Sequence, residues 1–161
     1  MIDEIHQGLA PDRAGVAFHP PVLLALCIAV GFGARWLIAL TFVPAGLSTV
    51  VRPVVTALAL GIFFWAVYAM RSEGGSIPTS EPTEAIVVRG PYRFSRNPIY
   101  VAMLLLQVGI GIWANSLWFI ALSAIFGVLL WWGVISREEE YLERKFGAEY
   151  ASYRSRVRRW I

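Results

Sequence analysis

The sequence has few of the residues that build disulfide-rich or metal-binding domains. It contains one cysteine and two histidines in 161 residues. A disulfide framework needs paired cysteines and a structural zinc site needs several cysteine or histidine ligands, so neither is expected, and no metal site is predicted. Cys27 lies inside an apolar run, where we expect it to be a packed core residue.

Charged residues are also scarce. They make up 16% of the chain, whereas hydrophobic residues make up 57%. A soluble domain of this size typically has about 25% charged residues, so the composition favours an integral membrane protein. The net charge of +3 lies mostly outside the apolar segments. Membrane lipids are therefore the expected partners, and nucleic acid is not.

Four apolar segments are long enough to cross a bilayer or nearly so: 21–43, 50–70, 98–114 and 117–136. Hydrocarbon cannot satisfy free backbone groups, so all four should be helices. The predicted fold is a single all-α membrane domain over 1–161, a bundle of about four transmembrane helices. Only Asn115 and Ser116 join the last two segments, which predicts an antiparallel hairpin with Ser116 as a helix cap.

Four spans place the N-terminus, the 71–97 loop and the C-terminal tail on one side. That side holds every lysine and arginine except Arg35 and Arg52, so the positive-inside rule predicts that both termini are cytosolic. The polar, acidic start of the chain is not typical of a cleaved signal peptide, and we interpret it as a cytosolic lead-in. Arg35 falls within an apolar segment, where we expect it to find an inter-helix partner or to snorkel.

Two cytosolic segments are expected to cover the bundle. The 71–97 loop is too long for a simple connection, and its glycines and prolines predict turns that pack over the mouth of the bundle. After residue 136 the chain becomes highly charged, with an apolar residue every three or four positions and a break expected at Gly147. This pattern predicts amphipathic helices that act as an interfacial anchor or a lid.

Polar residues of mixed charge gather at this cytosolic face. Arg89, Arg93 and Arg96 lie with Tyr92, Asn97 and Tyr100 before or at the start of the third span. Glu138, Glu139 and Glu140 follow the fourth span, and the antiparallel hairpin brings both groups to the same face. Three adjacent glutamates repel one another, so we expect either the local arginines or a cationic ligand to compensate them.

These residues carry a resemblance. The run VVRGPYRFSRNPIY at 87–100, a helical hairpin, and the pattern EExxLxxxFGxxYxxY starting at Glu138 together resemble the core of the isoprenylcysteine carboxyl methyltransferases and the related phospholipid methyltransferases. The resemblance covers 84–160 and implies a catalytic core at 84–161, preceded by two further spans and the start of the loop. The usual Arg-His-Pro of that family is here Arg96-Asn97-Pro98. Asn97 can form hydrogen bonds but cannot carry the proton of an imidazole.

The resemblance implies methyl transfer from S-adenosylmethionine to a lipophilic or membrane-borne carboxylate, thiol or amine. Glu138 or Glu139 would act as the base for an amine, and an arginine of the 89–96 cluster, such as Arg96, or of the C-terminal tail would hold an acceptor carboxylate or phosphate. The cofactor, which carries a sulfonium, an ammonium and a carboxylate, would bind near Gly90, Tyr92, Arg96, Asn97, Tyr100, Glu138 and Glu139. Gly109-Ile110-Gly111 is similar to a Gly-x-Gly of related enzymes, but we favour a helix-packing role for it.

Two other functions are compatible with the sequence. Membrane steroid 5-alpha reductases resemble this C-terminal region and use NADPH, although they are generally longer and the paired glutamates favour a methyltransferase. A small non-enzymatic membrane protein is the other alternative. A transporter should have polar residues facing a pathway at the membrane midplane, but only Arg35, Gln107 and a few hydroxyl residues lie within the spans, with no acidic residue.

Overall fold

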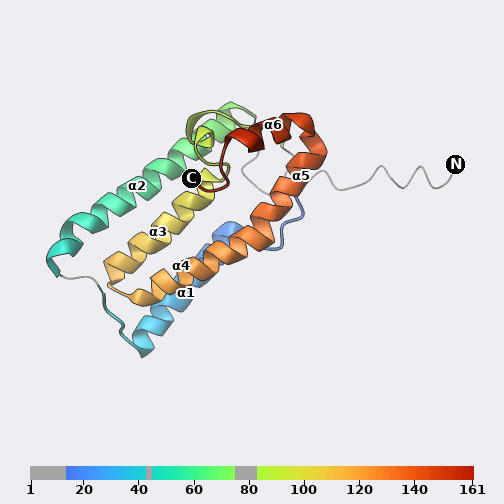
Figure 1. The fold of residues 1–161 in the computed structure, drawn as a ribbon. Coiled ribbons are helices and arrows are strands. Elements are labelled where there is room, and N and C mark those ends of the chain that lie inside the picture. The colour runs from blue at the N-terminus through green and yellow to red at the C-terminus, as the bar shows by residue number, and fades with distance from the viewer. Residues whose placement is uncertain (1–13, 43–44, 75–82) are drawn as a thin grey trace, which may run out of the picture.

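The computed structural model describes residues 14–42, 45–74 and 83–161, and its regular elements are all helices (Figure 1). Two long helices come first, α1 (Pro20–Leu37) and α2 (Ala45–Ser72). A short 3₁₀ turn, η2 (Gly90–Arg93), precedes α3 (Pro98–Ala114). The chain then continues through α4 (Leu117–Leu130), a π-helical turn η3 (Trp131–Ile135), α5 (Ser136–Phe146) and α6 (Ala148–Arg156).

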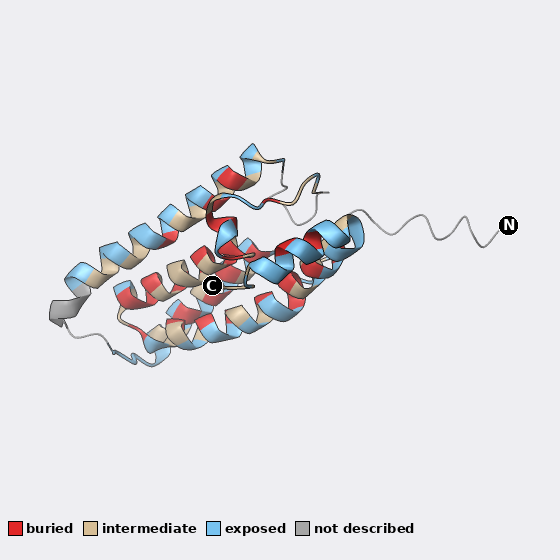
Figure 2. Ribbon diagram, turned by 45° about the horizontal axis from the view of Figure 1, so that its top comes forward, coloured by how far each residue is buried: buried red, intermediate tan, exposed pale blue. Residues whose placement is uncertain are grey.

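Three of these helices are long and apolar enough to cross a membrane. They are α1, the stretch Thr49–Ser72 of α2, and the continuous helix Leu117–Phe146, while α3 is a shorter apolar helix. Buried residues line the inner faces of the bundle, and exposed residues cover its outside (Figure 2). Large apolar side chains such as Trp36, Phe64 and Trp132 are exposed there, as expected for helices that contact lipid. The prediction of an all-α membrane bundle is confirmed.

The predicted first span extends too far. Helix α1 ends at Leu37, and the backbone then becomes extended at Ile38. Residues 38–42 run across the α3–α4 turn instead of continuing the helix. The Ile38 carbonyl accepts a hydrogen bond from Nε1 of Trp118, and the Leu40 carbonyl accepts one from the backbone N–H of Leu117. The segment therefore satisfies its backbone groups through the hairpin.

The α3–α4 hairpin forms as predicted, through a left-handed Asn115 with φ of 45°. Arg35 donates a hydrogen bond of 3.1 Å to the Asn115 carbonyl, which confirms an inter-helix partner for this arginine. The capping prediction for Ser116 is wrong, because its fully buried hydroxyl has no hydrogen-bond partner among the described residues. The Ser116 backbone makes the local contacts instead, with its N–H donating to Gly111 and its carbonyl accepting from Phe119.

The core lies between α1, α3 and α4. Cys27 is buried in it beside Leu24, Met103, Phe126 and Leu130, which confirms the prediction for this cysteine. Glycines allow the helices to approach closely. A Cβ at Gly111 would lie 2.7 Å from Cβ of Phe119, and one at Gly109 would lie 3.4 Å from Val55 on α2. The packing role predicted for Gly111 is confirmed, whereas a Cβ at Gly109 would make an ordinary van der Waals contact with α2.

The π-helical turn η3 anchors the segment that precedes α1. A Cβ at Gly133 would lie 2.5 Å from the ring of Phe18, and the Gly133 carbonyl accepts a hydrogen bond of 2.8 Å from the N–H of Ala17. Arg137 also donates to the carbonyl of Gly15. A glycine at this turn therefore lets residues 15–18 lie directly against the fourth apolar helix.

Replacing Gly111 by alanine should destabilise the bundle by about 1–3 kcal/mol, because the new methyl group would overlap a Cβ that cannot rotate away. Thermal unfolding in detergent measures the effect as a lower Tm. Gly61→Ala in α2 is the matched control, since no atom lies within 4 Å of the position of its added Cβ. An equal Tm for the two variants would contradict close packing at Gly111.

Candidate active site

One face of the bundle contains a cavity of about 460 Å³. Its size falls in the usual range for small-molecule sites, about 300–1,000 Å³. The wall is formed by the starts of α1 and α3, the second half of α2, the 83–87 segment, the first half of α5 and helix α6. Most of the wall is apolar, and its polar side chains are His19, Thr83, Tyr92, Arg96, Asn97, Tyr100, Glu138, Tyr141, Tyr150 and Tyr153.

The described part of the 71–97 loop packs over this cavity, as predicted; residues 75–82 lie outside the described residues. Val87 is buried against Ala66 and Ala69 of α2. Gly90 has φ of +58°, and a Cβ there would lie 3.1 Å from Nε1 of Trp65 and 3.2 Å from Cβ of Ala69. Glycine thus lets η2 lie against α2, and the turn presents Tyr92 to the cavity.

Glu138 lies in the cavity wall and accepts a hydrogen bond of 2.6 Å from the hydroxyl of Tyr100. This contact joins the first turn of α5 to the first turn of α3, the two helix ends that the hairpin brings to one face. Glu138 has no cationic partner among the described residues. A half-buried carboxylate without one can gain from a cationic ligand.

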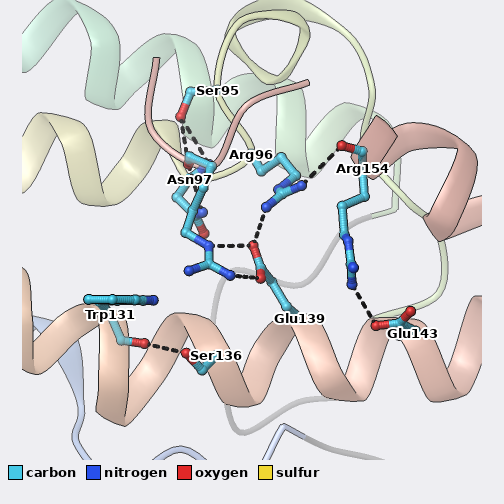
Figure 3. A network of polar contacts seen from close by, with 9 residues as sticks. Ser95, Arg96, Asn97, Trp131, Ser136, Glu139, Glu143 and Arg154 are labelled. Carbon is cyan, nitrogen blue, oxygen red and sulfur yellow. Dashed lines mark hydrogen bonds and ion pairs between the residues drawn. The ribbon is translucent and has the colours of Figure 1, made fainter. Parts of the chain in front are cut away.

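Glu139 lies beside the cavity and is compensated within the protein (Figure 3). Its Oε1 accepts hydrogen bonds from Arg96 at 2.7 Å and from Nε of Arg159 at 3.1 Å, and its Oε2 pairs with a terminal nitrogen of Arg159. Only about 10% of the Glu139 and Arg96 side chains is exposed. Glu140 is exposed and pairs with Arg144, so the local arginines compensate two of the three glutamates.

Two polar atoms at the cavity lack partners among the described residues. They are the hydroxyl of Tyr92 and Nε of Arg96, both fully buried. Arg96 is otherwise fixed, since one terminal nitrogen donates to Glu139 and the other to the Arg154 carbonyl. Buried polar groups are normally satisfied, so these two atoms are candidate contacts for a bound ligand.

The tyrosines of α6 complete the wall. Gly147, with φ of +52°, ends α5 and separates it from α6, as predicted. Tyr150 and Tyr153 are buried, and Tyr153 donates a hydrogen bond of 2.8 Å to the Tyr92 carbonyl. Burial, reinforced by the negative charge of Glu139, raises the pKa of Tyr150 to about 12. This phenol therefore stays neutral at physiological pH and cannot serve as a base.

Five of the seven residues expected near a cofactor line the cavity: Tyr92, Arg96, Asn97, Tyr100 and Glu138. Gly90 packs on α2, and Glu139 lies in the ion-pair network beside the cavity. Arg89 is largely exposed and pairs with Glu73.

Sequence reasoning missed the contributions of His19, Pro20 and Pro21, although the same topology that gathers the other helix ends also places the start of α1 here. It also did not assign Tyr150 and Tyr153 to the site, because their spacing indicated only an apolar stripe.

Comparison with known proteins gives one family and two relatives. The family model for phospholipid methyltransferases matches residues 47–149. An uncharacterized protein of Haemophilus influenzae is 41% identical over 64 residues, which cover 39% of this chain and all of that protein. The nickel-cobalt-cadmium resistance protein NccN of Alcaligenes xylosoxydans is 32% identical over 117 residues, which cover 73% of this chain and 50% of that protein. This chain thus spans about half the length of the resistance protein. No solved structure matches significantly.

Replacing Tyr153 by phenylalanine should lower the unfolding free energy by about 1 kcal/mol, because it leaves the buried Tyr92 carbonyl without its hydrogen bond. Tyr150→Phe is the matched control, since the Tyr150 hydroxyl has no hydrogen-bond partner among the described residues. Thermal unfolding in detergent compares the two. A larger loss for Tyr150→Phe would show that α6 is held on the bundle in another way.

Proposed function

This chain belongs to the phospholipid methyltransferase family, and from that premise we propose that it transfers a methyl group from S-adenosylmethionine to a lipophilic acceptor at the membrane surface. The observation that carries the proposal is the cavity. It combines an apolar wall with a carboxylate, Glu138, and a guanidinium N–H, Nε of Arg96, and within the described part of the chain the first has no cationic partner and the second no acceptor.

The chemistry of these residues fits the cofactor. Glu138 would hold its ammonium and Arg96 its carboxylate, while the Tyr92 hydroxyl, which has no partner in the part of the chain that the structure describes, offers a further hydrogen bond. Asn97 and Tyr100 line the same wall, and the surrounding apolar side chains would contact the adenosine. The cofactor, when bound, supplies a methyl group activated by the positive charge on sulfur.

The two candidate bases differ in their surroundings. Glu139 accepts hydrogen bonds from two arginines, so its oxygen lone pairs are already used in these contacts. Glu138 lines the cavity and accepts a hydrogen bond from Tyr100. If the acceptor is an amine, Glu138 is therefore the residue that takes its proton, with Tyr100 orienting the carboxylate. A thiolate or carboxylate acceptor needs no base.

The cavity also supports four spans with both termini in the cytosol. Pro20, Met70 and Tyr100 lie at one end of α1, α2 and α3, and Glu138 lies in the last third of the continuous helix Leu117–Phe146; all four line the same cavity. Successive helices must then alternate in direction. The excess of arginine and lysine at this face supports a cytosolic orientation, from which a soluble cofactor could enter.

The resistance protein raises a second candidate function. Among the described residues, no group of three or more His, Cys, Asp or Glu side chains is placed to hold a metal ion. The site therefore favours methyl transfer over metal binding as the proposed activity of this chain.

Calorimetric titration with S-adenosylhomocysteine and, separately, NADPH tests the proposal on the purified protein in detergent. We expect saturable binding of S-adenosylhomocysteine alone. Binding of NADPH alone would indicate that the protein is a reductase. Binding of neither ligand would contradict the proposed enzymatic function. Candidate acceptors, beginning with phosphatidylethanolamine vesicles and prenylated cysteine, can then be assayed with radiolabelled S-adenosylmethionine.

Replacing Glu138 by glutamine should weaken S-adenosylhomocysteine binding about 10- to 100-fold, because a hydrogen bond to a charged group is worth about 1.5–3 kcal/mol. Glu140→Gln makes the same change two residues away on an exposed side chain, and it should leave affinity unchanged. Equal affinities for both variants and the parent would refute the role of Glu138 in holding the ammonium.

A further inference from the structure

The last residues of the described chain bind directly to the cavity wall, although they lie outside the segment that matches the family. The backbone N–H of Arg96 donates a hydrogen bond of 2.9 Å to the Arg158 carbonyl. The Arg159 carbonyl accepts hydrogen bonds from the Asn97 amide at 2.9 Å and from the Ser95 hydroxyl at 3.4 Å. Residues 158–159 thus run alongside the turn that leads into α3.

The side chain of Arg159 forms the centre of this contact. It pairs with both carboxylate oxygens of Glu139 and lies over the ring of Trp131, with its guanidinium carbon 5.9 Å from the ring centroid. The next residue, Trp160, packs against the hydrophobic core. These contacts hold the Arg159 side chain in place. Because its guanidinium binds both oxygens of Glu139, it also restricts that carboxylate to one orientation.

This orientation decides which nitrogens of Arg96 are engaged. Glu139 accepts hydrogen bonds from two nitrogens of Arg159, and it accepts one from a terminal nitrogen of Arg96. Arg96 lines the cavity, and its Nε is buried and has no acceptor within residues 14–42, 45–74 and 83–161. A carboxylate without Arg159 could turn and bind Arg96 through two nitrogens, as isolated arginine–carboxylate pairs commonly do, and Nε could then be consumed.

We propose that Arg159 is a positioning residue, which occupies Glu139 and so keeps Nε of Arg96 available to an anionic group of the bound ligand. Asn97 serves the same arrangement, because its side-chain amide holds the carbonyl of Arg159. This inference rests on the proposed function, since the anionic group is the carboxylate of the cofactor or of its product.

The experiment measures S-adenosylhomocysteine affinity by calorimetry for Arg159→Gln, Arg159→Lys and Arg158→Gln in the full chain. Arg159→Gln should weaken binding about tenfold or more, because the ligand loses one charge-assisted hydrogen bond. Arg159→Lys should bind the ligand more tightly than Arg159→Gln but less tightly than the parent protein. Lysine keeps the positive charge but has no planar guanidinium to bind both carboxylate oxygens. Arg158→Gln removes the same charge from an exposed neighbouring side chain and should bind like the parent protein.

A double-mutant cycle separates positioning from a general loss of structure. If Arg159 acts through Glu139, Arg159→Gln should cost little further affinity in a Glu139→Gln background, and the two effects should be clearly non-additive. The Tm of each variant in detergent is measured alongside. Additive effects, or unchanged affinity in Arg159→Gln, would overturn the proposal.

Failure of the inference and failure of the proposed function give different results. If the parent protein does not bind S-adenosylhomocysteine, the proposed function fails, and the inference fails with it. If the parent binds and Arg159→Gln binds equally well, only the positioning role fails. A loss of affinity of equal size in Arg158→Gln would also reject it, because the effect would then follow net charge.

Discussion

The two-residue connection between α3 and α4 is the constraint on which the site depends. It reverses the chain within Asn115 and Ser116, so the start of α3 and the end of the following helix must lie at the same face. Arg96 and Tyr100 therefore meet Glu139 and Glu138, although about 40 positions separate them in the sequence. The segment 38–42 and Arg35 brace this turn from the opposite end of the bundle, so the geometry of the cavity is fixed partly by contacts remote from it.

The glutamates at this face illustrate how burial separates similar residues. Glu140 is exposed, and its pair with Arg144 contributes little, as surface ion pairs generally do. Glu139 is buried, and such a charge persists only because two guanidiniums satisfy it. Glu138 has a phenol as its partner and faces the cavity. Three adjacent residues of one type thus serve as a surface charge, a structural counter-ion and a candidate ligand-binding group.

Much of the fold was predictable from the sequence, because bilayer physics restricts long apolar segments to helices and a two-residue connection to a hairpin. The meeting of the 89–100 segment with Glu138 and Glu139 follows from those two facts. The division of labour between Glu138 and Glu139 was not predictable, because it depends on which face of α5 each residue occupies and on where the tail folds back. The contact between Phe18 and Gly133 was also not predictable, because it depends on a π-helical turn that the spacing of apolar residues does not indicate.

Asn97 shows why a departure from the usual family pattern need not disrupt this wall. Its amide donates to a backbone carbonyl of the tail, and its own backbone N–H donates to the Ser95 hydroxyl oxygen. The contact requires a donor at a fixed position and no transfer of a proton. Asparagine provides that donor at any physiological pH, whereas a histidine would gain or lose a charge beside Arg96 and Arg159. With two guanidiniums already sharing one carboxylate, a permanently neutral donor avoids adding a third positive charge to the same buried network.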